Sequence, residues 1–454
     1  MSTDTESLPW RALEAHAEQD DAEALRHEIE MLGPRESARC LSRLRPELQA
    51  RVFTVLDHET AAALLEEISE VQAAGFLDRL DTQKVAHILD AMDSDETADV
   101  LGRLSSRKVE EILATMEPDE AADARRLVRY DPHVGGGLMI TEFLAYPTTL
   151  TAQEVIDDMR RNSETYSEYS IQYSFVVSPD GKLQGVLPLR DLLLTPSDRP
   201  IGEFMIRNPL FVHDDTKLDE LEEFFDQNSF LGVPVCDRAG RLIGVVRRAD
   251  VEEAVGHRAE SDYLKTQGII GGDELRSMPT LLRSTRRLSW LSVNIALNII
   301  AASVIAFYQD TLAAVIALTV FIPIISDMSG CAGNQAVAVS MRELALGVVK
   351  PFEVLHVWLK EILVGLINGS VLGLLVGVAA WLWKGNIFLG IVAGSAMCIN
   401  TIVAVSIGGT VPLVLKLLNK DPALASGPIL TTVTDMCGFF LMLSLATLML
   451  GYLT

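Results

Sequence analysis

The sequence of 454 residues predicts a multi-domain protein: an α-solenoid at the N-terminus, two consecutive α/β units, and an all-α transmembrane domain of five helices. Three observations predict this order. Apolar residues recur every twelve positions in the first part, two similar strand-forming blocks follow, and long apolar runs fill the last part. The three regions therefore differ in both composition and period.

Charge is divided unevenly between the soluble and the apolar regions. The chain has a formal net charge of -24, yet the residues from Leu288 to the end contain only seven acidic and six basic side chains. A net charge of -23 therefore lies in residues 1–287. Such an acidic region repels nucleic acid and attracts cations, either metal ions or basic partners. We therefore expect no nucleic-acid partner.

Several classes of protein are disfavoured by missing patterns. The five cysteines include no CxxC pair, which predicts reduced thiols and no zinc site. The first ten residues, MSTDTESLPW, lack a basic stretch followed by an apolar core and do not resemble a signal peptide. A GxxxxGK[ST] phosphate-binding loop is also missing. We therefore expect a cytosolic N-terminal region and no enzymatic activity.

Residues 1–130 are predicted to form an acidic, cytosolic superhelix of twelve-residue repeats. The repeated apolar positions are Leu32, Leu44, Leu56, Ile68, Leu80, Met92, Leu104 and Met116. Helix starts are indicated by N-cap residues and by prolines of the first turn, at Asp57, Asp81, Asp93, Ser105, Pro34, Pro46 and Pro118. Short helices of this kind bury their apolar faces only by stacking on one another. The repeat favours a scaffold or sensor over an enzyme.

Two matching blocks follow, at residues 174–191 and 233–250. Each contains a strand, an Asp/Gly turn, a second strand and an acidic residue that enters a helix. We expect strands at Tyr173–Val177, Gly232–Cys236 and Leu242–Val246. The blocks resemble a tandem pair of CBS domains, the first in residues 139–200 and the second in residues 201–256.

The resemblance to CBS domains implies a possible nucleotide site, and the sequence departs from it. In many CBS pairs a Ser or Thr three residues after the second-strand glycine binds nucleotide together with the helix Asp. The two aspartates are present as Asp191 and Asp250, but Pro188 and Arg247 replace the hydroxyl residues. This departure argues against ATP binding.

Residues 257–287 are predicted to form a connecting helix, and residues 288–454 a transmembrane domain. Its five spans are expected at residues 288–308, 312–341, 352–383, 387–418 and 423–453, each long enough to cross the hydrocarbon core. Basic residues precede the first span and follow the second and fourth. The positive-inside rule then places the N-terminus in the cytoplasm and the C-terminus outside a cell inner membrane. Membrane lipid surrounds such a domain.

Ionisable residues within the spans indicate a pathway, because a charge in hydrocarbon is costly. Asp435 lies in the fifth span and Asp327 in the second. Two alternatives stay open: Asp327 is simply solvated near the cytoplasmic end, or Asp435 forms a helix–helix hydrogen bond. Pro323 and Pro412 are expected to interrupt the second and fourth spans and free carbonyl oxygens for the lining, and Gly427 with Pro428 is expected to bend the start of the fifth. An all-oxygen lining suits a hard cation such as hydrated magnesium.

The order of domains resembles the MgtE family of magnesium channels over essentially the whole chain. Two motifs carry the resemblance: Pro323 with Gly330, Gly333, Asn334 and Gln335, and the stretch 421–428 followed by Thr431, Thr432 and Asp435. The resemblance implies a homodimer with its pore between two membrane domains. The pore and metal-binding candidates are Asp435, Asp327, Asn334, Gln335, Gly330, Thr431 and Gly427.

The resemblance also implies regulation by the transported ion. Magnesium would enter passively and, when abundant, bind the acidic cytosolic domains and close the pore. The candidate regulatory ligands are Asp95, Asp219, Asp250, Glu253 and Asp262. Two departures from the family pattern, Cys331 and Asp327, predict a change in selectivity among magnesium, cobalt and manganese.

Two other functions remain open at this point. One is a coupled exchanger in which Asp327 and Asp435 alternately carry metal and a proton or sodium. The other is a sensor whose spans only anchor it. Chloride channels also carry CBS pairs, but those follow the membrane domain, whereas here they precede it.

Overall fold

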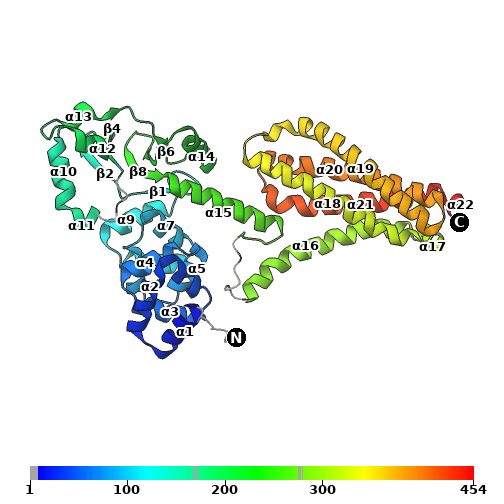
Figure 1. The fold of residues 1–454 in the computed structure, drawn as a ribbon, viewed down its shortest axis with the longest axis horizontal. Coiled ribbons are helices and arrows are strands. Elements are labelled where there is room, and N and C mark those ends of the chain that lie inside the picture. Colours follow the sequence, from blue (N-terminus) through cyan, green and yellow to red (C-terminus); the bar gives the residue numbers. More distant parts are fainter. Residues whose placement is uncertain (1–8, 167–168, 170–171, 273, 275–277, 279) are drawn as a thin grey trace, which may run out of the picture. The chain divides into compact units, whose positions relative to one another are not determined.

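The computed structural model describes residues 9–166, 169, 172–272, 274, 278 and 280–454 (Figure 1). The chain forms two compact units, Met1–Arg258 and Ala259–Thr454. The first unit contains the helical repeats and both sheets, and the second contains the long apolar helices.

The helical repeats form two rows, because each helix packs against the second helix along the chain. The helices are α1 (Pro9–Gln19), α2 (Ala22–Leu41), α3 (Pro46–Val55), α4 (His58–Glu66), α5 (Glu70–Leu77), α6 (Thr82–Leu89), α7 (Ser94–Gly102), α8 (Ser106–Leu113) and α9 (Pro118–Leu127). All eight repeated apolar positions are buried or half-buried in one continuous core. The predicted α-solenoid is confirmed.

The predicted N-caps differ in what their side chains do. Asp57, Asp81 and Ser105 each accept a hydrogen bond from a backbone N–H of the helix that they precede, at 2.8, 3.1 and 3.4 Å. Asp93 occupies the same position before α7 but makes no capping bond. Its carboxylate bonds Arg247 instead, at 2.6 Å. Tertiary contact therefore overrides local capping at this repeat.

Two four-stranded sheets follow the solenoid. The strands are β1 (Met139–Ile140), β2 (Leu144–Pro147), β3 (Tyr173–Val177), β4 (Leu183–Pro188), β5 (Ile206–Arg207), β6 (Val212–His213), β7 (Gly232–Cys236) and β8 (Leu242–Arg247). The helices are α10 (Ala152–Arg161), α11 (Ser163–Tyr166), α12 (Leu189–Leu194), α13 (Ile201–Phe204), α14 (Leu218–Gln227) and α15 (Arg248–Thr266). The three strands predicted from sequence are confirmed within one residue.

The two sheets exchange edge strands, which the sequence did not indicate. Their orders are β1-β8-β7-β6 and β2-β3-β4-β5. β1 lies in the expected first CBS domain but pairs with β8 of the second. β5 lies after the expected boundary at residue 200 but pairs with β4 of the first CBS domain. Strands of two residues carry too little periodicity to be assigned from sequence.

The second unit is built from long helices. They are α16 (Thr280–Phe307), α17 (Gln309–Ala314), α18 (Leu318–Ala345), the 3-10 helix η1 (Pro351–Glu353), α19 (Val354–Lys384), α20 (Ile387–Leu417), α21 (Pro422–Leu448) and α22 (Leu450–Leu453). Among the described residues, four helical stretches are long and apolar enough to cross a membrane: Thr280–Phe307, Pro351–Lys384, Ile387–Leu417 and Ser426–Leu448. α18 is as long as α16 but falls outside this set, because polar and charged residues interrupt its apolar sequence.

The connecting segment differs from the single helix expected over residues 257–287. α15 ends at Thr266 and α16 begins at Thr280. Gly268, Gly271 and Gly272 lie between them with φ of 80°, 105° and 69°, a conformation that favours glycine and ends a helix.

Glycines allow α18 and α19 to approach α20 closely. A Cβ at Gly408 of α20 would lie 2.2 Å from the carbonyl oxygen of Gly333 in α18. On α19, a Cβ at Gly369 or Gly373 would lie 2.6 Å from a carbonyl oxygen of α20. Small residues at such crossings are typical of helix packing in membranes.

Replacing Gly408 by alanine is expected to destabilise the membrane unit by about 1–3 kcal/mol, because the added methyl group forces α18 and α20 apart. Thermal unfolding of purified protein in detergent measures the effect. Gly451→Ala is the control, since a Cβ there meets nothing within 4 Å. Equal unfolding temperatures for the two variants would contradict the packing role.

Candidate functional site

A cavity of about 450 Å³ lies between α18 and α21 in the membrane unit. It brings together five of the candidate pore residues: Asp327, Gly330, Asn334, Thr431 and Asp435. The other lining residues are Ile322, Pro323, Ser326, Cys331 and Phe439. Side chains more than a hundred residues apart in sequence thus face one space.

Two candidate residues lie outside this cavity lining. Gln335 is exposed on α18, but it follows Asn334 directly and points about 100° further around the helix. Gly427 lies one turn before Thr431, and its carbonyl oxygen accepts the Thr431 hydroxyl hydrogen bond at 3.0 Å. The two motifs thus lie on the two helices that line this cavity, although not every motif residue faces it.

The two carboxylates of the cavity have different surroundings. Asp435 is half-buried, and the Ser326 hydroxyl donates a hydrogen bond to its Oδ1 atom. Asp327 is exposed and makes no hydrogen bond or ion pair within the part of the chain that the structure describes. The sequence motifs do not include Ser326, although a serine next to Asp327 in an apolar helix is a usable signal.

The prolines do not break the helices as expected. Pro323, Pro412 and Pro428 lie inside the continuous helices α18, α20 and α21. A proline removes one N–H donor, and the surrounding helix can continue when neighbouring helices hold it. The residues with side-chain oxygens in this lining therefore lie on continuous helices rather than on unwound backbone.

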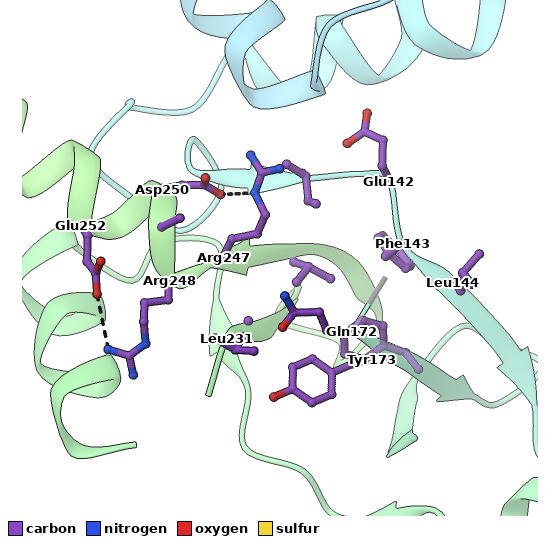
Figure 2. Close-up of a pocket in the computed structure, with 15 residues that line it drawn as sticks. Glu142, Phe143, Leu144, Gln172, Tyr173, Leu231, Arg247, Arg248, Asp250 and Glu252 are labelled. Atoms are coloured by element: carbon purple, nitrogen blue, oxygen red, sulfur yellow. Dashed lines mark hydrogen bonds and ion pairs between the residues drawn. The ribbon is translucent and has the colours of Figure 1, made fainter. Parts of the chain in front are cut away.

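A second cavity, of about 470 Å³, lies between the two CBS sheets (Figure 2). Asp250 lines it, whereas Asp191 does not. Figure 2 shows Arg247 bonded to Asp250, and Arg248 bonded to Glu252. Both guanidinium groups near this cavity are thus already paired with carboxylates, which leaves them less available to a phosphate group.

Arg247 joins the solenoid to the second CBS sheet. Its guanidinium group contacts Asp250 at 2.6 Å, Asp93 at 2.6 Å and Asp95 at 3.6 Å. The pKa values of Asp95 and Asp250 are raised, mainly by burial. The nearby Arg247 guanidinium offsets part of this rise in each case. The structure therefore places a built-in cation among carboxylates that include two of the candidate regulatory ligands.

The remaining regulatory candidates each contact a basic side chain. Asp219 pairs with Arg258, and Glu253 lies 3.7 Å from His257. Asp262 lies 3.5 Å from the Lys265 ammonium, which also lies 3.3 Å from Asp421 at the start of α21. In the described part of the chain, no three His, Cys, Asp or Glu side chains are arranged to hold a metal ion.

Two half-buried carboxylates of α7, Glu96 and Asp99, predict a pH dependence of stability. Burial, with a smaller contribution from nearby carboxylates, raises the pKa of Glu96 to about 8 and that of Asp99 to about 7. The folded state therefore retains protons that the unfolded chain has lost above about pH 4.5, so stability should fall as pH rises from 4.5 to 8.

Thermal unfolding of the full chain in a magnesium chelator, between pH 5 and pH 8.5, measures this dependence. The Glu96→Gln, Asp99→Asn double variant should show a flatter profile. A wild-type stability that rises over the same range would contradict the burial of these groups.

Comparison with known proteins agrees with this organisation. Residues 322–445 match the family described as a divalent cation transporter, MgtE. Residues 32–133 match the MgtE intracellular N domain, and residues 134–197 and 201–257 match CBS domains.

Several known proteins match this chain over most of its length or over its cytosolic part. A magnesium transporter MgtE of Thermus thermophilus is 32% identical over 97% of this chain and 98% of its own length. One of Enterococcus faecalis is 32% identical over 74% of this chain and 73% of its own length. The crystal structure of the cytosolic domain of the Mg²⁺ channel MgtE in complex with ATP matches 54% of this chain and 99% of its own, with 28% identity and a TM-score of 0.50. This chain belongs to the MgtE family of magnesium transporters.

Proposed function

We propose that the protein mediates passive entry of Mg²⁺ through the cavity between α18 and α21. The observation that supports this most is the presence of two carboxylates, Asp327 and Asp435, in one cavity between two long helices. Two carboxylates at that depth are costly unless they face water or a cation. A divalent ion gains about 4.6 kcal/mol per 100 mV on entering a negative cell, so ATP hydrolysis is not needed.

The lining favours a hydrated hard cation. Carboxylate, hydroxyl and amide oxygens come from Asp435, Thr431 and Asn334. Mg²⁺ releases its water reluctantly and is commonly held through water by one or two carboxylates. Cys331 is the exception in this lining, since its sulfur is a softer group than the oxygens around it.

Growth provides a simple test of this function. Expression of the chain should restore growth at low magnesium to a bacterial strain that lacks its own magnesium transporters. Restoration should fail at the same expression level when the chain carries both Asp327→Ala in α18 and Asp435→Ala in α21. Growth restored equally by the double variant would mean that the cavity is not the pathway.

We further propose that two copies enclose the pathway. α18 presents an exposed face that includes Pro323, Asp327, Cys331, Asn334 and Ala338. Exposure of these polar side chains to lipid would be unfavourable. If the same face packs against a second copy of the chain, that copy closes the cavity from the other side. The C₂ arrangement is the commonest symmetry of homo-oligomers.

Cross-linking at Cys331 tests this homodimer. Cys331 is exposed, whereas Cys40 and Cys236 are buried and Cys398 and Cys437 are half-buried. Thiol-specific bifunctional reagents of increasing length should therefore yield a covalent dimer in native membranes that Cys331→Ser removes. A dimer band that survives Cys331→Ser, or Cys331 that is labelled without any dimer, would contradict the proposed interface.

The proposal extends to regulation by magnesium in the acidic region. We propose that Mg²⁺ at carboxylates such as Asp95, Asp219, Asp250, Glu253 and Asp262 favours the closed state. The Lys265 contacts with Asp262 and Asp421 support this for the membrane unit, because they join the end of α15 to the start of the helix that carries Asp435. A divalent ion that competes for these carboxylates would change that connection.

The solved cytosolic domain of the Mg²⁺ channel MgtE is in complex with ATP, but the pairing of Arg247 and Arg248 with carboxylates argues against strong phosphate binding in this chain. We place the first unit in the cytoplasm. Basic residues precede the first predicted span and follow the second and fourth, and the positive-inside rule assigns these ends to the cytoplasm.

A coupled exchanger is the second candidate. The observation that favours it is again the pair Asp327 and Asp435, since two carboxylates in one cavity can bind a metal and a proton in alternation. The two mechanisms differ in whether the driving force on Mg²⁺ alone sets the direction of flow.

A further inference from the structure

Ser326 and Asp435 form a polar contact between α18 and α21 inside the cavity. The Ser326 hydroxyl donates to Oδ1 of Asp435, and both residues line the cavity wall. The Oδ2 atom of Asp435 has no hydrogen bond from any of the residues that the structure describes. The protein therefore holds one carboxylate oxygen through a hydrogen bond, while the other has no protein donor and is open to a ligand.

The backbone that carries Asp435 is fixed from the opposite side. Asn400 of α20 is fully buried, and its amide Nδ2 donates to the Thr434 carbonyl oxygen at 3.1 Å. A Cβ at Gly438 would lie 2.8 Å from the same Nδ2 atom, so α20 and α21 are in close contact here. Rotation of α21 is thus restricted, and the main freedom left to Asp435 is its side-chain rotamer.

The Ser326 hydrogen bond removes that remaining freedom. A carboxylate held by one hydroxyl at Oδ1 can present a single oxygen to the water shell of a hydrated ion. It cannot readily turn both oxygens toward a dehydrated ion. Ca²⁺ is commonly bound by bidentate carboxylates in flexible sites, whereas Mg²⁺ keeps several waters.

We propose that Ser326 is a specificity-determining residue that favours Mg²⁺ over Ca²⁺ by holding Asp435 in a monodentate geometry. The inference rests on the proposed function, in which Asp435 faces the permeating ion. Ser326 acts through Asp435 and is therefore a positioning residue. Its loss frees Oδ1, lets the carboxylate rotate, and opens a bidentate mode that Ca²⁺ uses better than hydrated Mg²⁺.

The test compares Ca²⁺ and Mg²⁺ influx into proteoliposomes that contain the full chain. Ser326→Ala should raise the ratio of Ca²⁺ to Mg²⁺ influx by about tenfold, the size expected for loss of a hydrogen bond to a charged group. Ser326→Thr keeps the hydroxyl group and should retain the wild-type ratio. Ser444→Ala is the matched control, because Ser444 also lies in the membrane unit and its hydroxyl bonds only carbonyl oxygens of its own helix, at 2.5 and 3.3 Å.

The outcomes separate this inference from the proposed function. An unchanged ratio in Ser326→Ala, in protein that still carries Mg²⁺, would overturn the role of Ser326 alone. A ratio that changes equally in Ser326→Ala and Ser326→Thr would also overturn it, because volume rather than the hydroxyl would then matter. If Ser326→Ala does not fold, the nearly isosteric Ser326→Cys, a weaker donor, carries the same comparison. Wild-type protein without Mg²⁺ influx would instead contradict the proposed function.

Discussion

Replacing Asp435 by alanine is expected to abolish Mg²⁺ influx into proteoliposomes, with a loss of about a hundredfold or more. The carboxylate is half-buried in the cavity between α18 and α21, where no basic side chain lines the wall. In a medium of effective dielectric constant near 20, one carboxylate attracts a divalent cation by several kcal/mol at contact distance, and about 1.4 kcal/mol corresponds to tenfold. A magnesium-sensitive dye inside the vesicles measures the influx.

The matched control for this variant is Asp310→Ala. Asp310 is exposed in α17 and lies outside the cavity lining, so its loss should leave influx unchanged. Both variants should elute from a sizing column as the wild type does. Wild-type influx in Asp435→Ala would exclude this carboxylate from the pathway and would favour the function of an anchored sensor.

Replacing Arg247 by methionine is expected to destabilise the contact between the solenoid and the second CBS sheet. The guanidinium group is 23% exposed and is paired with Asp93, Asp95 and Asp250. Removing one partner of a mostly buried ion pair leaves uncompensated charge and typically costs about 3–5 kcal/mol. We expect about 2–4 kcal/mol here because solvent reaches part of the group, or a fall of about 5–15 °C in the first unfolding transition.

Magnesium should partly restore the stability of Arg247→Met, because Mg²⁺ can replace the lost positive charge among the three carboxylates. Arg107→Met is the control: Arg107 is 90% exposed and pairs only with Glu111 one turn away, so its effect should stay below about 1 kcal/mol. Equal unfolding temperatures for both variants would show that Arg247 does not hold this contact.

Local patterns allowed the solenoid to be predicted in detail. Its period is set by residues that are close in sequence, so Leu56, Leu80 and Met92 could be placed in the core and Asp57 at a helix start. The exception, Asp93, bonds a residue 154 positions later. No local pattern reports a partner at that distance.

The CBS pair and the connector were predicted less completely. The strands Tyr173–Val177 and Gly232–Cys236 were found because their apolar runs and turns are local. The edge strands β1 and β5 are two residues long, and their pairing is decided by tertiary structure. Arg247 was noted only as a departure from nucleotide-binding CBS domains, and the sequence could not indicate the three carboxylates that surround it.

The candidate pathway was predicted by residue type, and its faces were set by packing. Asp327, Asn334 and Asp435 share one cavity as expected, whereas Gln335 and Gly427 lie outside its lining. The rotation of α18 and α21 depends on contacts such as Gly333 against Gly408, which pair residues from different helices. Ser326 was missed for the same reason, since its partner becomes visible only when the helices are assembled.

The reversal potential of currents through the purified protein in planar bilayers tests the central claim most directly. With Mg²⁺ as the permeant ion at different concentrations on the two sides, a passive pathway predicts reversal at the Mg²⁺ equilibrium potential at any pH or sodium concentration. A reversal potential that shifts with a pH or sodium gradient would contradict it, because Asp327 and Asp435 would then couple Mg²⁺ to a second ion.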